Sequence, residues 1–120
     1  MEYGKHLLVE VIVKDYTPLV RVGCIKRFFR EIVKELNFQV IGKPFFYKFP
    51  SRMKKMQGGI TGMCVIAESH LSIHTWPESN YFAFDLFSCR NFDEKKVMKE
   101  KQETILMKLQ VGDYAWPEDY

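Results

Sequence analysis

The chain has 120 residues, a length typical of one domain that can bury its own hydrophobic core. Apolar residues make up 47% of it and aromatic residues 15%, which excludes an intrinsically disordered protein. The formal net charge is only +3 and no basic groove with interleaved aromatics is visible, so we expect no nucleic-acid partner.

The cysteines and the apolar runs exclude further classes of protein. The three cysteines show no paired spacing, which argues against a disulfide framework and a cysteine-rich zinc site. We expect no signal peptide, and no apolar run reaches the ~18 residues that span a bilayer. A cytoplasmic protein with no membrane partner is therefore the expectation.

The first elements in the chain are a strand and a helix. Leu7–Val13 is apolar and β-branched, which predicts a buried strand. Thr17 and Pro18 are typical of a helix start, and Asn37 ends the pattern. Between them, apolar residues recur at helical spacing and predict an amphipathic helix of about five turns. These apolar residues are Val22, Ile25, Phe28, Phe29, Ile32, Val33 and Leu36.

Most of the remaining chain is typical of short strands separated by turn residues. The expected strands are 38–41, 45–49, 60–67, 70–75 and 81–89, with a loop over 50–59. The strand at 70–75 is either the hairpin partner of the preceding strand or its continuation across a bend. Asn91 or Asp93 begins a second helix that runs to about Leu109, and residues 109–120 form a tail.

This order of elements predicts an α+β fold over residues 1–120, with an antiparallel sheet and two helices packed on one face. The other face of such a sheet needs cover. We expect two copies of the chain to supply it for each other, as a homodimer in which the two sheets meet.

Residues 67–78 read Ala-Glu-Ser-His-Leu-Ser-Ile-His-Thr-Trp-Pro-Glu. Taken alone, Ser69 is typical of a polar turn, and no Gly-x-Ser-x-Gly elbow marks a serine hydrolase. On a strand His70 and His74 would share a face about 13 Å apart, too far to bind one metal ion. The His-Glu-x-x-His pattern is also absent, so we expect no metal site.

The run belongs to a longer resemblance. Three blocks of the chain resemble the bacterial and archaeal S-adenosylmethionine decarboxylases. They are Gly4-Lys5-His6-Leu7-Leu8-Val9-Glu10, the block from Gly59-Ile60-Thr61-Gly62 to Glu78, and Asp85-Leu86-Phe87-Ser88-Cys89. About three-quarters of the chain is covered. The resemblance implies a pyruvoyl-dependent enzyme that decarboxylates a small molecule, S-adenosylmethionine, for spermidine biosynthesis and is commonly a dimer.

The resemblance also implies self-cleavage between Glu68 and Ser69. The Ser69 hydroxyl would attack the preceding carbonyl, and elimination would then leave dehydroalanine at residue 69. Hydrolysis with loss of ammonia would give a pyruvoyl group on an α chain of residues 69–120, beside a β chain of residues 1–68. His74 matches the processing base and Thr61 the processing hydroxyl. An imidazole suits proton abstraction near neutral pH. An ordinary strand residue remains the alternative for Thr61.

Four other residues match positions that act on the substrate. Cys89 matches the catalytic cysteine, which returns a proton after carbon dioxide leaves; the alternative is a small buried residue. Phe49 and Trp76 match the aromatic pair that stacks adenine, and Glu78 matches the residue that accepts ribose hydroxyls. The pyruvoyl group would form a Schiff base with the substrate amine. For Phe49, Trp76 and Glu78, the alternative is ordinary packing or a surface charge.

The chain departs from the family pattern at three places. Ser51–Gln57 is an insertion with three basic residues, Tyr47 replaces a usual histidine, and Arg90 replaces a usual glycine. Two alternatives therefore remain. One is a pyruvoyl-dependent relative that decarboxylates arginine or ornithine. The other is a paralogue that does not process and has a binding or regulatory role.

Overall fold

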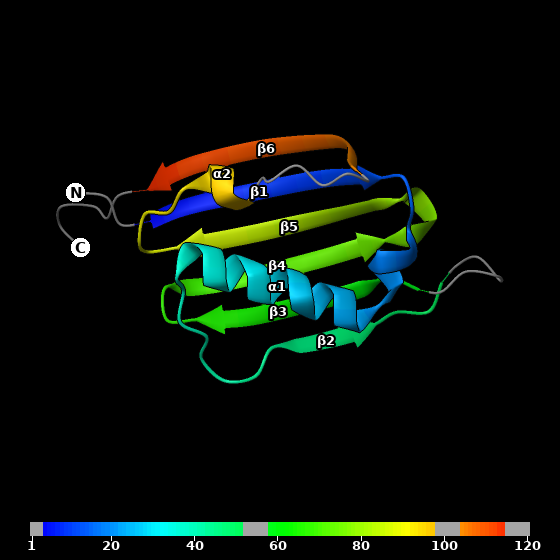
Figure 1. Ribbon diagram of the computed structural model, residues 1–120, viewed down its shortest axis with the longest axis horizontal. Coiled ribbons are helices and arrows are strands. Elements are labelled where there is room, and N and C mark those ends of the chain that lie inside the picture. The colour runs from blue at the N-terminus through cyan, green and yellow to red at the C-terminus, as the bar shows by residue number, and fades with distance from the viewer. Residues whose placement is uncertain (1–3, 52–57, 98–103, 115–120) are drawn as a thin grey trace.

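The computed structural model describes residues 4–51, 58–97 and 104–114 and shows one six-stranded sheet whose paired strands are all antiparallel (Figure 1). Its strand order is β2-β3-β4-β5-β1-β6, and both α-helices lie on the same face. The elements are β1 (Gly4–Val13), η1 (Thr17–Val20), α1 (Val22–Leu36), β2 (Phe45–Lys48), β3 (Ile60–Ile66), β4 (Ser69–Trp76), η2 (Pro77–Ser79), β5 (Tyr81–Ser88), α2 (Glu94–Val97) and β6 (Thr104–Tyr114).

The core lies between α1 and the sheet. Strand side chains alternate between faces, so every second residue of β1, β3, β4 and β5 points toward the helix. Ile25, Phe29 and Ile32 of α1 are buried against them, as are Leu71 and Ile73 of β4. Burial of each such side chain stabilises the fold by roughly 1.5–3 kcal/mol. The predicted α+β fold with two helices on one face is therefore confirmed.

The start of the first helix differs from the prediction, but its end agrees. Pro18 opens only a short 3₁₀ turn, and Arg21, with φ −111° and ψ 112°, separates this turn from α1. Thr17 caps no helix, because its hydroxyl donates to the Asp15 carboxylate at 2.7 Å. Asn37 ends α1 in the left-handed conformation with φ 56°, which asparagine tolerates well.

The second helix and the tail were predicted wrongly. The helical residues described are Glu94–Val97, and Thr104–Tyr114 forms β6, which pairs with β1 along its length. Without β6 the backbone donors and acceptors on that side of β1 would be left as a free sheet edge, and pairing satisfies them. The strand expected over 38–41 is also reduced to one bridge, between Val40 and Ile66.

The second face of the sheet has no helix over it in the described parts of the chain, and we call it the open face. Exposed apolar and aromatic side chains gather there. They include Phe45, Tyr47, Met63, Val65 and Trp76. No helix among the described residues is long and apolar enough to cross a membrane. An apolar sheet face of this kind fits the expected contact with a second copy, which stays a prediction.

A buried threonine connects the sheet to the segment before α1. The Thr75 hydroxyl donates to the Leu19 carbonyl at 2.8 Å and accepts from the Ile60 N–H at 2.8 Å. Thr75→Val leaves both backbone groups unpaired, so we expect it to lower the unfolding free energy by about 2 kcal/mol in urea denaturation. Thr75→Ser keeps the hydroxyl and should cost less. A valine variant as stable as the serine variant would contradict this account.

Candidate active site

Glu68 and Ser69 lie at the hairpin turn between β3 and β4. Ile66 pairs with Ser69, so Ala67 and Glu68 alone form the loop. Ser69 is the first residue of β4, and its φ angle of 157° is close to fully extended backbone. The hairpin prediction for residues 70–75 is thereby confirmed, and its bend lies at the bond where cleavage is expected.

Backbone contacts hold the carbonyl side of this bond. The N–H of Cys89 donates to the Glu68 carbonyl oxygen at 2.8 Å. On the other side of the turn, Gln39 accepts from the Ala67 N–H at 2.8 Å and donates its own N–H to Glu68 Oε1 at 3.2 Å. The carbonyl that Ser69 would attack is therefore fixed in place and polarised by a backbone donor.

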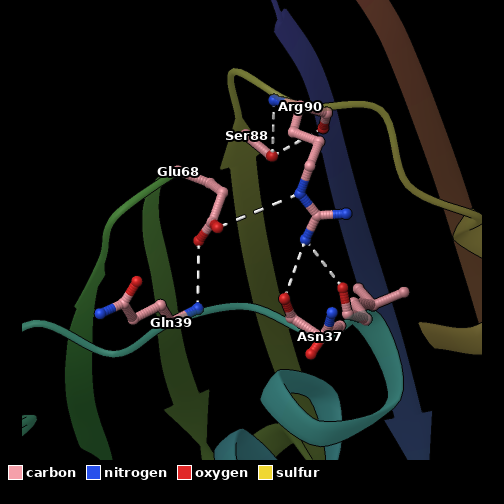
Figure 2. Close-up of polar contacts among 6 residues, drawn as sticks. Asn37, Gln39, Glu68, Ser88 and Arg90 are labelled. Atoms are coloured by element: carbon pink, nitrogen blue, oxygen red, sulfur yellow. Dashed lines mark hydrogen bonds and ion pairs between the residues drawn. The ribbon is translucent and has the colours of Figure 1, made fainter.

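Arg90 ties the same turn to the end of α1 (Figure 2). Its guanidinium donates to the carbonyls of Leu36 and Asn37 at 2.9 and 3.1 Å, where the helix leaves carbonyls without a helical partner. Its Nε lies 4.0 Å from Glu68 Oε2, and at this distance, with the Arg90 side chain partly exposed, the ion pair adds little energy. The Ser88 hydroxyl accepts from the Arg90 N–H at 3.0 Å and donates to the Arg90 carbonyl at 2.6 Å.

A second cluster lies around a cavity of about 330 Å³, a volume that suits a small ligand. The structure brings five of the predicted site residues together here. The lining residues are Phe49, Pro50, Ser51, Gly59, Thr61, His74, Thr75, Trp76 and Glu78. Two of the aromatic rings stay available for a ligand, since Phe49 is 53% exposed and Trp76 is 40% exposed.

Hydrogen bonds and stacking shape this cavity. Thr61 Oγ1 lies 2.9 Å from His74 Nδ1, across the β3–β4 pair. Trp76 stacks on Tyr81 with ring centroids 5.1 Å apart. The Tyr81 hydroxyl donates to Glu10 at 2.7 Å, and this hydrogen bond raises the pKa of Tyr81. The Tyr81 hydroxyl therefore stays protonated, and its hydrogen bond to Glu10 holds the ring on which Trp76 stacks.

Gly59 is required where the loop carrying Phe49 meets the sheet. The Phe49 N–H donates to the Gly59 carbonyl at 2.8 Å. A Cβ at position 59 would lie 2.0 Å from the Thr75 carbonyl oxygen, far inside contact distance.

Two of the departures from the family pattern lie near this cavity. The insertion Ser51–Gln57 lies mostly outside the described residues, which include only its first residue, Ser51. Tyr47 sits on the open face directly opposite Thr61, next to the cavity.

The two clusters are separated along β4. Ser69 begins the strand and His74 lies five residues further on, which corresponds to about 16 Å of extended chain. Within one chain, then, the structure places Glu68, Ser69 and Cys89 together, and it does not bring His74 to them.

Sequence reasoning missed a group of side chains beside Ser69. Ser69 Oγ lies 3.3 Å from His70 Nδ1. His70 Nε2 lies 3.7 Å from Asp85 Oδ1, and His6 Nε2 lies 2.8 Å from the same oxygen. Only the pairing register of β4 with β5 and of β5 with β1 brings these residues together, so no local motif could reveal them. In the described ranges, no group of three or more His, Cys, Asp or Glu side chains could hold a metal ion.

Comparison with known proteins gives the family. The family model described as S-adenosylmethionine decarboxylase matches residues 5–111. The chain belongs to the S-adenosylmethionine decarboxylase family. A relative from Clostridium botulinum, named S-adenosylmethionine decarboxylase proenzyme, is 30% identical over 110 residues, which are 90% of this chain and 89% of the relative.

Two further comparisons agree with that assignment. A Pyrococcus horikoshii protein with the same name is 34% identical over 96 residues, covering 79% of this chain and 64% of its own length. The crystal structure of the adenosylmethionine decarboxylase from Aquifex aeolicus superposes with a TM-score of 0.77 at 25% identity, over 99% of this chain and 96% of that one. The fold and the family resemblance are thus confirmed together.

Arg90, where the family pattern has glycine, offers a test of the contacts in Figure 2. Arg90→Gly removes two hydrogen bonds and a positive charge from the C-terminus of α1, so we expect the unfolding free energy to fall by about 1–2 kcal/mol. Arg90→Lys keeps the charge and should lose less. Urea denaturation measures both. Equal stability of the glycine variant and the wild type would show that the Arg90 contacts contribute nothing to the unfolding free energy.

Proposed function

We propose that this protein is an S-adenosylmethionine decarboxylase proenzyme that cleaves itself between Glu68 and Ser69. The names of its relatives support the activity, and the word proenzyme in those names supports self-processing. One observation carries the proposal for this chain. The Glu68 carbonyl accepts a hydrogen bond from the Cys89 N–H, and it belongs to the peptide bond that leads into Ser69, whose hydroxyl would attack it.

The first step is an N-to-O acyl shift. Ser69 Oγ loses its proton and bonds to the Glu68 carbonyl carbon, and the Cys89 N–H stabilises the negative charge that develops on the oxygen. The bond from that carbon to the Ser69 nitrogen then breaks, and an ester replaces the amide. Removal of the Ser69 Cα proton next expels the Glu68 carboxylate, which divides the chain and leaves dehydroalanine at residue 69. Addition of water and loss of ammonia then convert the dehydroalanine into a pyruvoyl group.

Residue 69 is well placed to carry the resulting pyruvoyl group. It opens β4 at the end of the sheet, and the exposed Cys89 lies across the turn. The group would supply a carbonyl for the substrate amine and an electron sink for decarboxylation. Cys89 is the side chain at this end that can return a proton through its thiol, the role that we assign to it.

The cavity at the other end of β4 suits an adenosyl sulfonium substrate. Phe49 and Trp76 offer aromatic faces for stacking adenine and for contact with the positive sulfur. Glu78 is the carboxylate of the cavity and would accept hydrogen bonds from the ribose hydroxyls.

An arginine or ornithine decarboxylase is not favoured, because the relatives carry the name of the S-adenosylmethionine enzyme. The serine, threonine and histidine of the processing machinery are all present, which disfavours a paralogue that does not process.

A homodimer reconciles the two separated clusters. If open faces of two copies meet about a two-fold axis perpendicular to the strands, the strand directions reverse across the interface. The Thr61–His74 end of one β4 then faces the Ser69 end of the other. We propose that each complete site takes Ser69 from one copy and His74 from its partner, with His74 removing the Cα proton.

Self-cleavage is tested directly by mass spectrometry of purified protein. We expect wild type to yield two fragments, residues 1–68 and 69–120, with the second blocked to Edman degradation. Ser69→Ala removes the attacking hydroxyl and should stay one chain. Wild-type protein that remains intact after prolonged incubation would overturn the proposed function.

Cys89→Ala separates the two roles of residue 89. Alanine keeps the backbone N–H that holds the Glu68 carbonyl, so self-cleavage should still occur. Loss of the thiol should slow decarboxylation of S-adenosylmethionine by a factor on the order of 10²–10⁴, measured as release of labelled carbon dioxide. Wild-type turnover in this variant would remove the thiol from the mechanism. Activity on arginine in place of S-adenosylmethionine would overturn only the substrate.

A further inference from the structure

The side chains beside Ser69 form a connected series across three strands. Ser69 Oγ lies 3.3 Å from His70 Nδ1, and His70 Nε2 lies 3.7 Å from Asp85 Oδ1. The His70 ring stacks on Phe87 with an angle of 19° between the planes and the centroids 6.3 Å apart. We propose that His70 is the base that removes the Ser69 hydroxyl proton in the acyl shift, an inference that rests on the proposed self-cleavage.

The geometry assigns the imidazole its tautomer. For Nδ1 to accept the hydroxyl proton, the neutral ring must carry its own proton on Nε2, which is the nitrogen nearer Asp85. At 3.7 Å the carboxylate is beyond hydrogen-bond distance, so it lies as a nearby negative charge on the Nε2 side of the ring. Many unrelated enzymes activate a serine in this way: a base contacts the nucleophile, and a third group orients the base.

His6 fixes the carboxylate. Its Nε2 lies 2.8 Å from Asp85 Oδ1 and so donates to the same oxygen that faces His70. His6 acts on Asp85, and Asp85 in turn faces the His70 ring, so we assign these two as positioning residues and His70 as the catalytic one. His74 lies about 16 Å along the same strand from Ser69 and cannot act on the hydroxyl of its own chain.

The proton moves in a closed cycle during the step. His70 Nδ1 takes it from Ser69 Oγ as the oxygen–carbon bond to Glu68 forms. The same proton passes to the Ser69 nitrogen as the amide bond breaks, which leaves a free amine, an ester and a neutral imidazole. No oxidant, reductant or further reactant is required. The two histidines of the motif thereby act at different steps, His70 before the ester and His74 after it.

Hydroxylamine distinguishes these two steps because it cleaves esters and leaves amides intact. The His74→Ala precursor should accumulate the ester, and hydroxylamine should cut it between residues 68 and 69. The His70→Asn precursor should form the ester 10²–10⁴-fold more slowly, so hydroxylamine should leave it whole. Asparagine is chosen because it preserves a polar atom near the Nδ1 position but is not a base. Asp85→Asn should slow cleavage less than His70→Asn.

Ser72→Ala, on the same strand and the same face as His70, is the matched control and should cleave like wild type. Circular dichroism and thermal unfolding confirm that each variant is folded. If hydroxylamine cuts His70→Asn as readily as His74→Ala, or if His70→Asn cleaves itself at the wild-type rate, the assignment of His70 is wrong. Cleavage of wild type and of Ser72→Ala in the same experiment shows that self-processing itself stands.

Discussion

The extended path of β4 decides how this protein can assemble an active site. An extended strand places Ser69 and His74 about 16 Å apart, and its hydrogen bonds to β3 and β5 prevent it from bending to bring them together. The chain therefore holds two separate groups of candidate site residues, one at each end of the strand. Ser69 has its own neighbours in His70 and the backbone of Cys89, while Thr61 and His74 border the cavity with the aromatic side chains.

The turn at Ser69 depends on contacts from segments that are distant in the sequence. Gln39 follows α1, and Cys89 and Arg90 follow β5, yet all three contact Glu68. The register of β3, β4 and β5 aligns Ile66, Ser69 and Ser88 across the sheet, and this alignment places the Cys89 N–H on the Glu68 carbonyl. The fold thus holds the Glu68–Ser69 peptide bond in place through backbone contacts, and the proposed base and proton donor are side chains beside it.

Hydrophobic periodicity predicts β1, α1, β3 and β5, because each buries one face against a single core. It fails over Thr104–Tyr114, where an apolar pattern fits either period and the free edge of β1 selects a strand. The family resemblance predicts five of the residues that line the cavity. It cannot reveal the approach of Asp85 to His70, which depends on strand register, or the separation of Ser69 from His74, which depends on the straightness of β4.

The sharing of each site between two copies is tested most directly with mixed dimers. Ser69→Ala and His74→Ala chains, carrying different tags, are co-expressed, and dimers that contain both are isolated. Each variant alone should stay intact. In the mixed dimer the His74→Ala chain should be cut between Glu68 and Ser69, because its partner supplies His74, while the Ser69→Ala chain stays whole. Mixed dimers in which both chains remain intact, or a chain that forms no dimer, would contradict the shared site.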